Sequence, residues 1–355
     1  MKSNRWKTQL GTNIENGKPP QFVIFTDRDG TIDLGDKKLK KKKKKINIMG
    51  GIVIPTTGRT VGDMIESLKN SDIDPPDIII GDNGANIYSC RESRFINKML
   101  LEHEKVIEII NQFINNGGNS DLIRYTDGST IVASKDKYVE RYYKNSKVAV
   151  FSENIEEAIN HALEVTKITL AGTKEDMEKI SKYIKTLGYW TDIGATKFPT
   201  GTNGNYRLDI AQNNINKGNA VKKVTHEIIQ PRYGYICVGN GENDIPMFKQ
   251  AIDDGMIAAI MKNSPPEIIK EMKKYAKDKP GRVILVPENK TLANEFLLKI
   301  AKIFESKMKA QQEAEKRAKK RNERLPNVQR VKTLGISPKG GTGKNTRNRE
   351  KGKII

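Results

Sequence analysis

Residues 22–31 read Phe22-Val23-Ile24-Phe25-Thr26-Asp27-Arg28-Asp29-Gly30-Thr31, an apolar run that ends at an acidic turn. Such a run is typical of a short strand buried in a parallel sheet. Asp27 and Asp29 then follow the carboxyl end of that strand, where open α/β sheets place their ligands. Two carboxylates so close together are costly unless a cation binds them. An Asp-rich turn without chemistry is the alternative, and Gly30-Thr31 together with the strand makes it the weaker interpretation.

The same alternation of strands and helices recurs in two separate parts of the chain. Ile52-Val53-Ile54 runs into Thr57-Gly58-Arg59, Thr60 caps a helix, and residues 77–80 form a third expected strand. Beyond residue 212 the expected helices are 218–230, 245–252 and 265–276, and the expected strands are 234–238, 256–261 and 282–286. Strands that alternate with helices predict a parallel α/β sheet.

The middle of the chain has a different pattern, with expected strands at 121–134, 167–171, 189–193 and 205–211 and expected helices at 102–115, 153–163 and 174–187. The strand pair 121–126 and 129–134, divided by Asp127-Gly128, is typical of a hairpin. Hairpins mixed with helices predict a separate α+β domain. The predicted fold is therefore α/β, with a Rossmann-like parallel sheet core interrupted by an inserted α+β cap.

The predicted domain boundaries follow these changes of pattern. We expect an N-terminal extension at 1–20, a core made of 21–86 and 212–304, and a cap at 87–211. Residues 305–355 form a basic tail, which we expect to be helical through Arg324 and disordered from 325 to 355, because few apolar side chains remain to be buried.

The net charge of +20 comes from two local segments rather than from the whole surface. Lys37–Lys45 holds eight lysines, and residues 305–355 hold 16 Lys/Arg against five Asp/Glu. The remainder is nearly neutral, which weakens a nucleic-acid-binding interpretation. We expect the lysine run to be a solvated helix face or loop. The tail offers at most a weak contact to nucleic acid or to an anionic surface.

Hydropathy, the N-terminal sequence and the two cysteines indicate the cellular compartment in which we expect the protein. The mean hydropathy is −0.62, and no apolar run approaches the roughly 20 residues of a membrane span. No secretory signal is visible at the N-terminus. Cys90 and Cys237 are far apart in strand-like contexts, so free thiols in a reducing cytoplasm are expected.

Three further segments carry polar groups on the expected elements. Thr57 ends the second strand, Lys217 opens a helix where an ammonium can meet an anion, and Gly239-Asn240-Gly241-Glu242-Asn243-Asp244 follows another strand. Taken singly, each has an ordinary alternative, namely a helix cap, a surface lysine and a turn.

Together these segments resemble the four signature motifs of the haloacid dehalogenase superfamily, in order and on the right elements. Thr57-Gly58-Arg59, Asn83-Gly84-Ala85, Leu208-Asp209-Ile210, Lys217-Gly218 and Asn243-Asp244 resemble its Cof-type branch, with a large αβ cap like that of sucrose-phosphate phosphatases. The resemblance spans residues 21–300 and implies hydrolysis of a small phosphorylated metabolite, such as a phosphosugar.

The resemblance also implies roles for individual residues. Asp27 would be the nucleophile that forms an aspartyl-phosphate, and Asp29 would act as general acid and then as general base. Thr57, Gly58 and Lys217 would hold the transferring phosphoryl group. A Mg²⁺ ion would be bound by Asp27, by the backbone carbonyl of Asp29 and by the fourth motif. In that motif Asn240 would be a ligand, Asp244 would support the metal site, and Asn243 would orient nearby groups.

One position departs from the family, whose members usually have Asp where this chain has Asn240. An amide oxygen can still bind Mg²⁺, but the site loses one negative charge. Two alternatives therefore stay open. One is a degenerate phosphometabolite-binding protein with weak or no turnover. The other is a nucleic-acid-associated protein that acts through its basic tail.

Overall fold

The computed structural model describes residues 19–32, 36, 38–115, 122–126, 129–133, 149–152, 164–200, 204–287 and 290–323. The helix expected at 153–163, the turn at 127–128 and the disorder expected from 325 onward lie outside these residues. Within them, the elements alternate as the sequence predicts, and both parts of the interrupted α/β pattern join one sheet.

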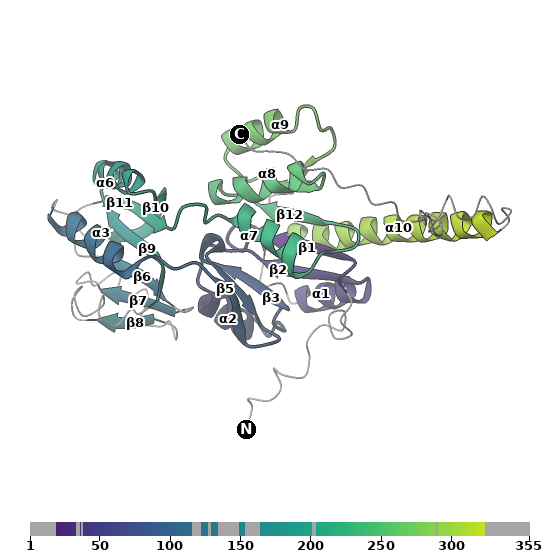
Figure 1. The fold of residues 1–355 in the computed structure, drawn as a ribbon, viewed down its shortest axis with the longest axis horizontal. Coiled ribbons are helices and arrows are strands. Elements are labelled where there is room, and N and C mark those ends of the chain that lie inside the picture. The colour runs from purple at the N-terminus through teal and green to yellow at the C-terminus, as the bar shows by residue number, and fades with distance from the viewer. Residues whose placement is uncertain are drawn as a thin grey trace, which may run out of the picture. The chain divides into compact units, whose positions relative to one another are not determined.

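The core is a five-stranded sheet in which every neighbouring pair is parallel. Its strands, in spatial order, are β14 (Val283–Val286), β13 (Ile257–Met261), β12 (Tyr235–Gly239), β1 (Phe22–Thr26) and β2 (Gly51–Pro55). Figure 1 labels three of these strands, β12, β1 and β2, which lie together near α7 (Lys217–Lys223). A parallel bridge between Thr56 and Ile80 adds β3 (Ile78–Gly81) beside β2. The predicted α/β fold class is confirmed.

Helices cover both faces of this sheet. Successive side chains of a strand point to opposite faces, so each buried strand packs against helices on both sides. Val23 and Phe25 pack in the apolar cluster that contains α7 (Lys217–Lys223), α8 (Ile245–Asp253) and α9 (Pro266–Tyr275). Phe22 points to the other face, where its ring stacks on Phe304 of α10 (Lys290–Glu323) at 4.8 Å. Helices α1 (Leu39–Ile48) and α2 (Val61–Asn70) contribute to a second cluster around Met64 and Ile79.

Local signals place several of these helices. The Thr60 hydroxyl accepts a hydrogen bond from the Asp63 amide at 3.0 Å, which caps α2 as its sequence predicts. The helix expected at 218–230 begins at Lys217 and continues after α7 as a π-helical turn, Val224–Ile228. Residues 309–321 of α10 are exposed and belong to a second unit that starts at Glu305. Among the described residues, no helix is long and apolar enough to cross a membrane.

A second, six-stranded sheet forms the module that we call the cap, together with helices α3 (His103–Asn115) and α6 (Lys174–Thr186). Its strands, in spatial order, are β10 (Trp190–Thr200), β11 (Gly204–Ala211), β9 (Val165–Gly172), β6 (Leu122–Thr126), β7 (Ser129–Ala133) and β8 (Ala149–Ser152). The expected hairpin is present, because β6 and β7 pair antiparallel. One face of the sheet packs against α3 and α6 through residues such as Ile168 and Leu208.

The predicted start of the insertion at residue 87 falls inside a strand that belongs to the core. Strand β4 (Asn86–Ser89) pairs with β3, and β5 (Arg94–Lys98) pairs with β4 in the same three-stranded sheet. Ile87 lies in the apolar cluster of the core sheet. Hydrogen bonding and packing therefore hold residues 86–98 to the core, and we propose that the cap begins after Lys98.

The lysine run folds as α1, and one of its faces is not solvated as expected. Leu39, Lys42 and Ile46 are buried, at the three- and four-residue spacing of a helix face. The Lys42 ammonium lies 2.8 Å from a carboxylate oxygen of Asp36. Lys43 donates to the backbone carbonyl of Asp74 at 2.6 Å, and burial lowers the pKa of Lys43 to about 8. The run thus contributes to the fold of the core.

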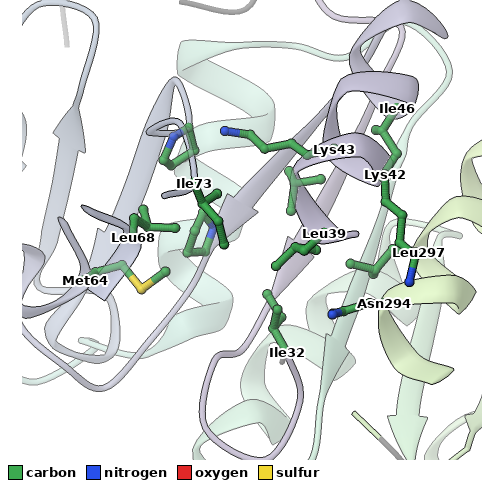
Figure 2. A pocket seen from close by; sticks show the side chains of 13 residues that line it. Ile32, Leu39, Lys42, Lys43, Ile46, Met64, Leu68, Ile73, Asn294 and Leu297 are labelled. Carbon is green, nitrogen blue, oxygen red and sulfur yellow. The ribbon is translucent and has the colours of Figure 1, made fainter. Parts of the chain in front are cut away.

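A cavity of about 40 Å³ lies between α1, α2, β2 and α10. Figure 2 shows apolar side chains such as Leu39 and Met64 around it, with the ammonium groups of Lys42 and Lys43 pointing in different directions. None of the residues predicted for the functional site lines this cavity. It is a packing space between the sheet and its helices.

Candidate active site

The predicted site residues meet at one edge of the core sheet. Strands β1, β2 and β12 are parallel neighbours, and their carboxyl ends lead to Asp27, Thr57 and Asn240 respectively. The main chain joins these ends, since the Asp27 amide donates to the Val238 carbonyl at 2.8 Å. The topology alone therefore gathers segments that lie far apart in the sequence.

Lys217 connects two carboxylates at the centre of this edge. Its ammonium lies 2.6 Å from Oδ1 of Asp27 and 2.6 Å from Oδ1 of Asp244. Asp27 is 5% exposed, and Lys217 and Asp244 are fully buried. The Asn216 side chain caps α7 by accepting from the Asn219 amide at 2.8 Å, which fixes Lys217 in the first turn of the helix.

Burial and charge act against each other on this cluster. Burial raises the pKa of Asp27 to about 7, against the attraction of the Lys217 ammonium. Burial alone would lower the pKa of Lys217, but Asp244 and Asp27 hold it above its usual value. Lys217 is therefore a permanent positive charge beside the Asp27 carboxyl group.

Asp244 organises the turn that follows β12. Its second oxygen, Oδ2, accepts from the backbone amides of Asn240 at 2.8 Å and Gly241 at 2.9 Å. Both carboxylate oxygens of Asp244 are thus engaged, one by Lys217 and one by the turn. This geometry fits the supporting role that the sequence predicts for Asp244.

Asn240 lies directly against the loop that carries the two aspartates. The Thr31 hydroxyl donates to Oδ1 of Asn240 at 3.3 Å. A side chain at Gly30 would come within 2.3 Å of the Asn240 amide nitrogen, and the φ of Gly30 is +85°. Only glycine fits here without strain. Asn243 lies nearby, where its amide donates to Oδ1 of Asn83 at 3.0 Å.

Thr57, Gly58 and Arg59 form a tight turn beside the end of β1. The Thr57 hydroxyl, in a residue 1% exposed, accepts from the Arg59 amide at 3.1 Å. A side chain at Gly58 would lie 2.9 Å from Oδ1 of Asn83. The turn is therefore packed closely against the segment that follows β3.

Asp29 is held by an arginine to which the sequence pattern gave no role. Nε of Arg59 lies 2.7 Å from one carboxylate oxygen of Asp29, and Nη2 lies 2.9 Å from the other. Burial would raise the pKa of Asp29, but the hydrogen bonds and charge of Arg59 keep it below the usual value. No local sequence signal joins these two residues, because 30 positions separate them.

A cleft of about 400 Å³ lies beside the site, with walls from both the core and the cap. Asn83, Asn216 and Asn243 line it from the core, and Trp190 and Asp192 line it from β10. Lys167 of β9 also reaches the core, since its ammonium donates to the Gly58 carbonyl at 3.0 Å. Sequence reasoning identified none of these cap residues, because their positions depend on how the two sheets meet.

Known structures share this fold. A haloacid dehalogenase-like hydrolase from Bacteroides thetaiotaomicron is similar over 78% of this chain and 98% of its own, with 19% identity and a TM-score of 0.58. A sugar phosphatase of subclass IIB is similar over 79% of this chain and 98% of its own, with 19% identity and a TM-score of 0.56. A HAD/COF-like hydrolase from Plasmodium vivax is similar over 82% of this chain and 98% of its own, with 17% identity and a TM-score of 0.58.

These likenesses confirm the fold that the motifs predict. No protein with a curated description matches the sequence. The family model of haloacid dehalogenase-like hydrolases matches residues 24–285, which include both halves of the core and the cap between them. The chain therefore belongs to the haloacid dehalogenase-like hydrolases.

Proposed function

We propose that the protein is a Mg²⁺-dependent phosphatase that hydrolyses a small phosphorylated metabolite, such as a phosphosugar. The buried Asp27–Lys217–Asp244 cluster carries this proposal, because it places a carboxylate nucleophile beside a fixed ammonium. The ammonium balances charge on a transferring phosphoryl group. Membership of the hydrolase family and the subclass IIB sugar phosphatase with the same fold support it.

The reaction takes two steps. In the first, an Asp27 oxygen attacks phosphorus, the bond from phosphorus to the leaving oxygen breaks, and Asp29 gives that oxygen a proton. In the second, Asp29 takes a proton from water as the water oxygen attacks phosphorus. The bond to Asp27 then breaks and inorganic phosphate leaves. The Thr57 hydroxyl, the Gly58 amide and Lys217 hold the remaining phosphoryl oxygens throughout.

The donor set fits Mg²⁺, which prefers oxygen ligands. Lys217 bonds Oδ1 of Asp27, so the second oxygen of this carboxylate can face a cation. The Asp29 backbone carbonyl and the Asn240 amide oxygen complete the protein ligands, and Asp244 supports them by fixing the turn. The bound ion would supply positive charge that offsets the negative charge of the phosphoryl group. Asn240 contributes one negative charge less than an aspartate would.

The cap supplies selectivity in this proposal. The cleft beside the site is lined by Trp190 and Asp192 of the cap and by the core residues Asn83 and Asn243. A leaving group with hydroxyls could stack on the ring and bond the polar groups. Covering the site would also exclude bulk water during the first step.

Phosphate release from a panel of phosphorylated sugars, glycerates and an aryl phosphate tests the proposal. Wild type should release phosphate with Mg²⁺ and stop when the metal is chelated. Asp27→Asn should lose roughly four orders of magnitude, as with other covalent nucleophiles. The matched control, Asp278→Asn, changes an exposed aspartate of the core and should behave as wild type. Equal turnover by a folded Asp27→Asn variant would overturn the mechanism.

Asn240 favours a second candidate function, a phosphometabolite-binding protein with little turnover, because an amide gives the metal site one negative charge less than an aspartate. The same panel separates the two. Calorimetric binding of a phosphorylated compound without release of phosphate would favour the binding protein, whereas Mg²⁺-dependent release favours the enzyme.

A further inference from the structure

Lys167 is a buried lysine of the cap whose ammonium contacts the catalytic turn of the core. It lies in β9, and its side chain is 3% exposed. Its ammonium donates to the backbone carbonyl of Gly58 at 3.0 Å and lies 3.3 Å from Oδ2 of Asp209. The first contact joins the cap to the core through two residues that are 109 positions apart in the chain.

The cap contains a carboxylate partner for this charge, Asp209, whose Oδ2 also lies 3.7 Å from Nε of Arg207. Burying an ammonium is expensive unless a carboxylate and hydrogen bonds compensate for the lost water. Asp209, 4% exposed at its side chain, supplies the carboxylate and also accepts from the Thr169 hydroxyl at 2.6 Å. Lys167 and Asp209 thus form a buried ion pair on one face of the cap sheet. Ile168 and Leu208 lie on the opposite face and pack against the cap helices.

The carbonyl that Lys167 contacts is the middle one of three in the turn. The outer two bond the core, since the Asn83 amide donates to Thr57 at 3.0 Å and the Asp82 amide donates to Arg59 at 2.9 Å. The carbonyl of Gly58, between them, is bonded by the cap. The turn is therefore fixed by the core at both ends and by Lys167 at its centre.

This turn controls two groups of the proposed mechanism. Thr57 precedes Gly58 and presents a phosphate-holding hydroxyl, and Arg59 follows it and holds both carboxylate oxygens of Asp29. A shift of the Gly58 carbonyl would move both neighbours, because peptide units are planar and the turn is short. Displacements of about 1 Å in such positions can cost roughly 10²-fold in rate.

We propose that Lys167 is a positioning residue that couples docking of the cap to the geometry of the Thr57–Arg59 turn. It thereby aligns the phosphate-holding hydroxyl and the acid–base carboxylate only when the cap lies on the core. The kinetic part of this inference rests on the proposed phosphatase function. The structural part, which is the dependence of the Thr57–Arg59 turn on Lys167, does not rest on that proposed function.

Three variants test the kinetic part. Lys167→Met/Asp209→Asn removes both charges and leaves no unpaired carboxylate, and it should lower kcat by about 10- to 100-fold with KM changed less than about threefold. Lys167→Arg keeps a donor and should recover most of kcat. Lys105→Met, the control, removes a cap lysine of α3 that pairs with Glu108 at 2.7 Å, and it should match wild type.

The pattern across substrates separates positioning from recognition of the leaving group. A positioning residue lowers kcat by the same factor for an aryl phosphate and for a phosphosugar. A loss that appears in KM for the phosphosugar alone would overturn the proposal. So would normal kinetics in a folded Lys167→Met/Asp209→Asn variant.

Hydrogen exchange gives a readout without turnover. The amides of Thr57, Asp82 and Asn83 bond Ile80, Arg59 and Thr57 respectively, so their exchange reports the order of the turn. Exchange should accelerate there in the double variant and stay unchanged within α3. Unaltered exchange in the turn would refute the coupling. If wild type releases no phosphate but exchange in the turn still accelerates in the double variant, only the proposed function is refuted.

Discussion

Arg59 binds Asp29 through two parallel hydrogen bonds, with Nε 2.7 Å from Oδ2 and Nη2 2.9 Å from Oδ1. This fork geometry is the strong form of an ion pair between guanidinium and carboxylate. It keeps the Asp29 carboxylate charged and fixed in place. The proposed acid–base group therefore starts from a defined position, and Arg59 must yield when Asp29 takes up a proton.

Asp29→Asn should lower kcat by roughly 10²- to 10⁴-fold, because an amide can neither give nor take the proton. Arg59→Met should act differently, since the loss of the guanidinium raises the pKa of Asp29 toward its usual range. The acid limb of the kcat profile, which reflects the step in which Asp29 must accept a proton from water, should then move to higher pH. Arg94→Met removes an exposed arginine paired with Glu92 and serves as control. An unmoved limb would show that Asp29 does not set it.

Asn240→Asp should lower the Mg²⁺ concentration for half-maximal activity by about tenfold or more, because a carboxylate attracts the cation more strongly than an amide. Asp has nearly the same shape, so the contacts with Gly30 and Thr31 can be kept. The measurement is a magnesium titration of phosphate release for both forms. An equal metal requirement would mean that residue 240 is not a ligand.

Trp190→Ala should raise KM for a phosphosugar while leaving KM for a small aryl phosphate nearly unchanged. The indole lines the cleft between cap and core, so its loss removes stacking area only for a leaving group that fills the cleft. Steady-state kinetics on both substrates checks this. An equal change in KM for both substrates would show that the leaving group does not bind against Trp190.

Asp82 should make stability depend on pH between about 4 and 6. Burial raises the pKa of Asp82 to about 6, whereas an unfolded Asp titrates near 3.9. The folded protein therefore binds a proton that the unfolded chain has lost in this window. Its stabilising contribution is complete below pH 4 and is lost as the pH rises through 6.

Asp82→Asn should remove this dependence, a difference of about 3 kcal/mol across the window. The comparison is the free energy of unfolding by urea at pH 4, 5, 6 and 7 for both forms. Parallel pH curves would show that Asp82 titrates at the same pH in the folded protein and in the unfolded chain.

Truncation after Arg324 should leave phosphatase activity unchanged, because the tail carries none of the proposed site residues. Full-length protein should bind RNA or anionic vesicles more tightly than the truncated form, and high salt should abolish the difference. Activity assays and a salt titration of binding measure the two effects. Loss of activity on truncation would assign the tail a part in the fold or the site.

The sequence by itself determined the α/β core and the residues at its strand ends. Apolar runs of five residues followed by Asp27, Thr57 and Asn240 are local patterns, and parallel strands must bring their carboxyl ends to one edge. The hairpin at 121–134 and the cap of α2 at Thr60 were also predictable, since turn and capping residues act within a few positions. The lysine run was harder to interpret, because composition suggested solvent while helical spacing buried Lys42.

Only the tertiary structure decided the contacts that cross long distances in the chain. Strand pairing joined β4 and β5 to β3 in a three-stranded sheet, and this supports the proposed start of the cap after Lys98 rather than at residue 87. Arg59 meets Asp29, and Lys167 meets Gly58, because separate elements pack together. A side chain's partner across 30 or 109 positions depends on sheet order and module docking, and neither leaves a periodic signal in the residues themselves.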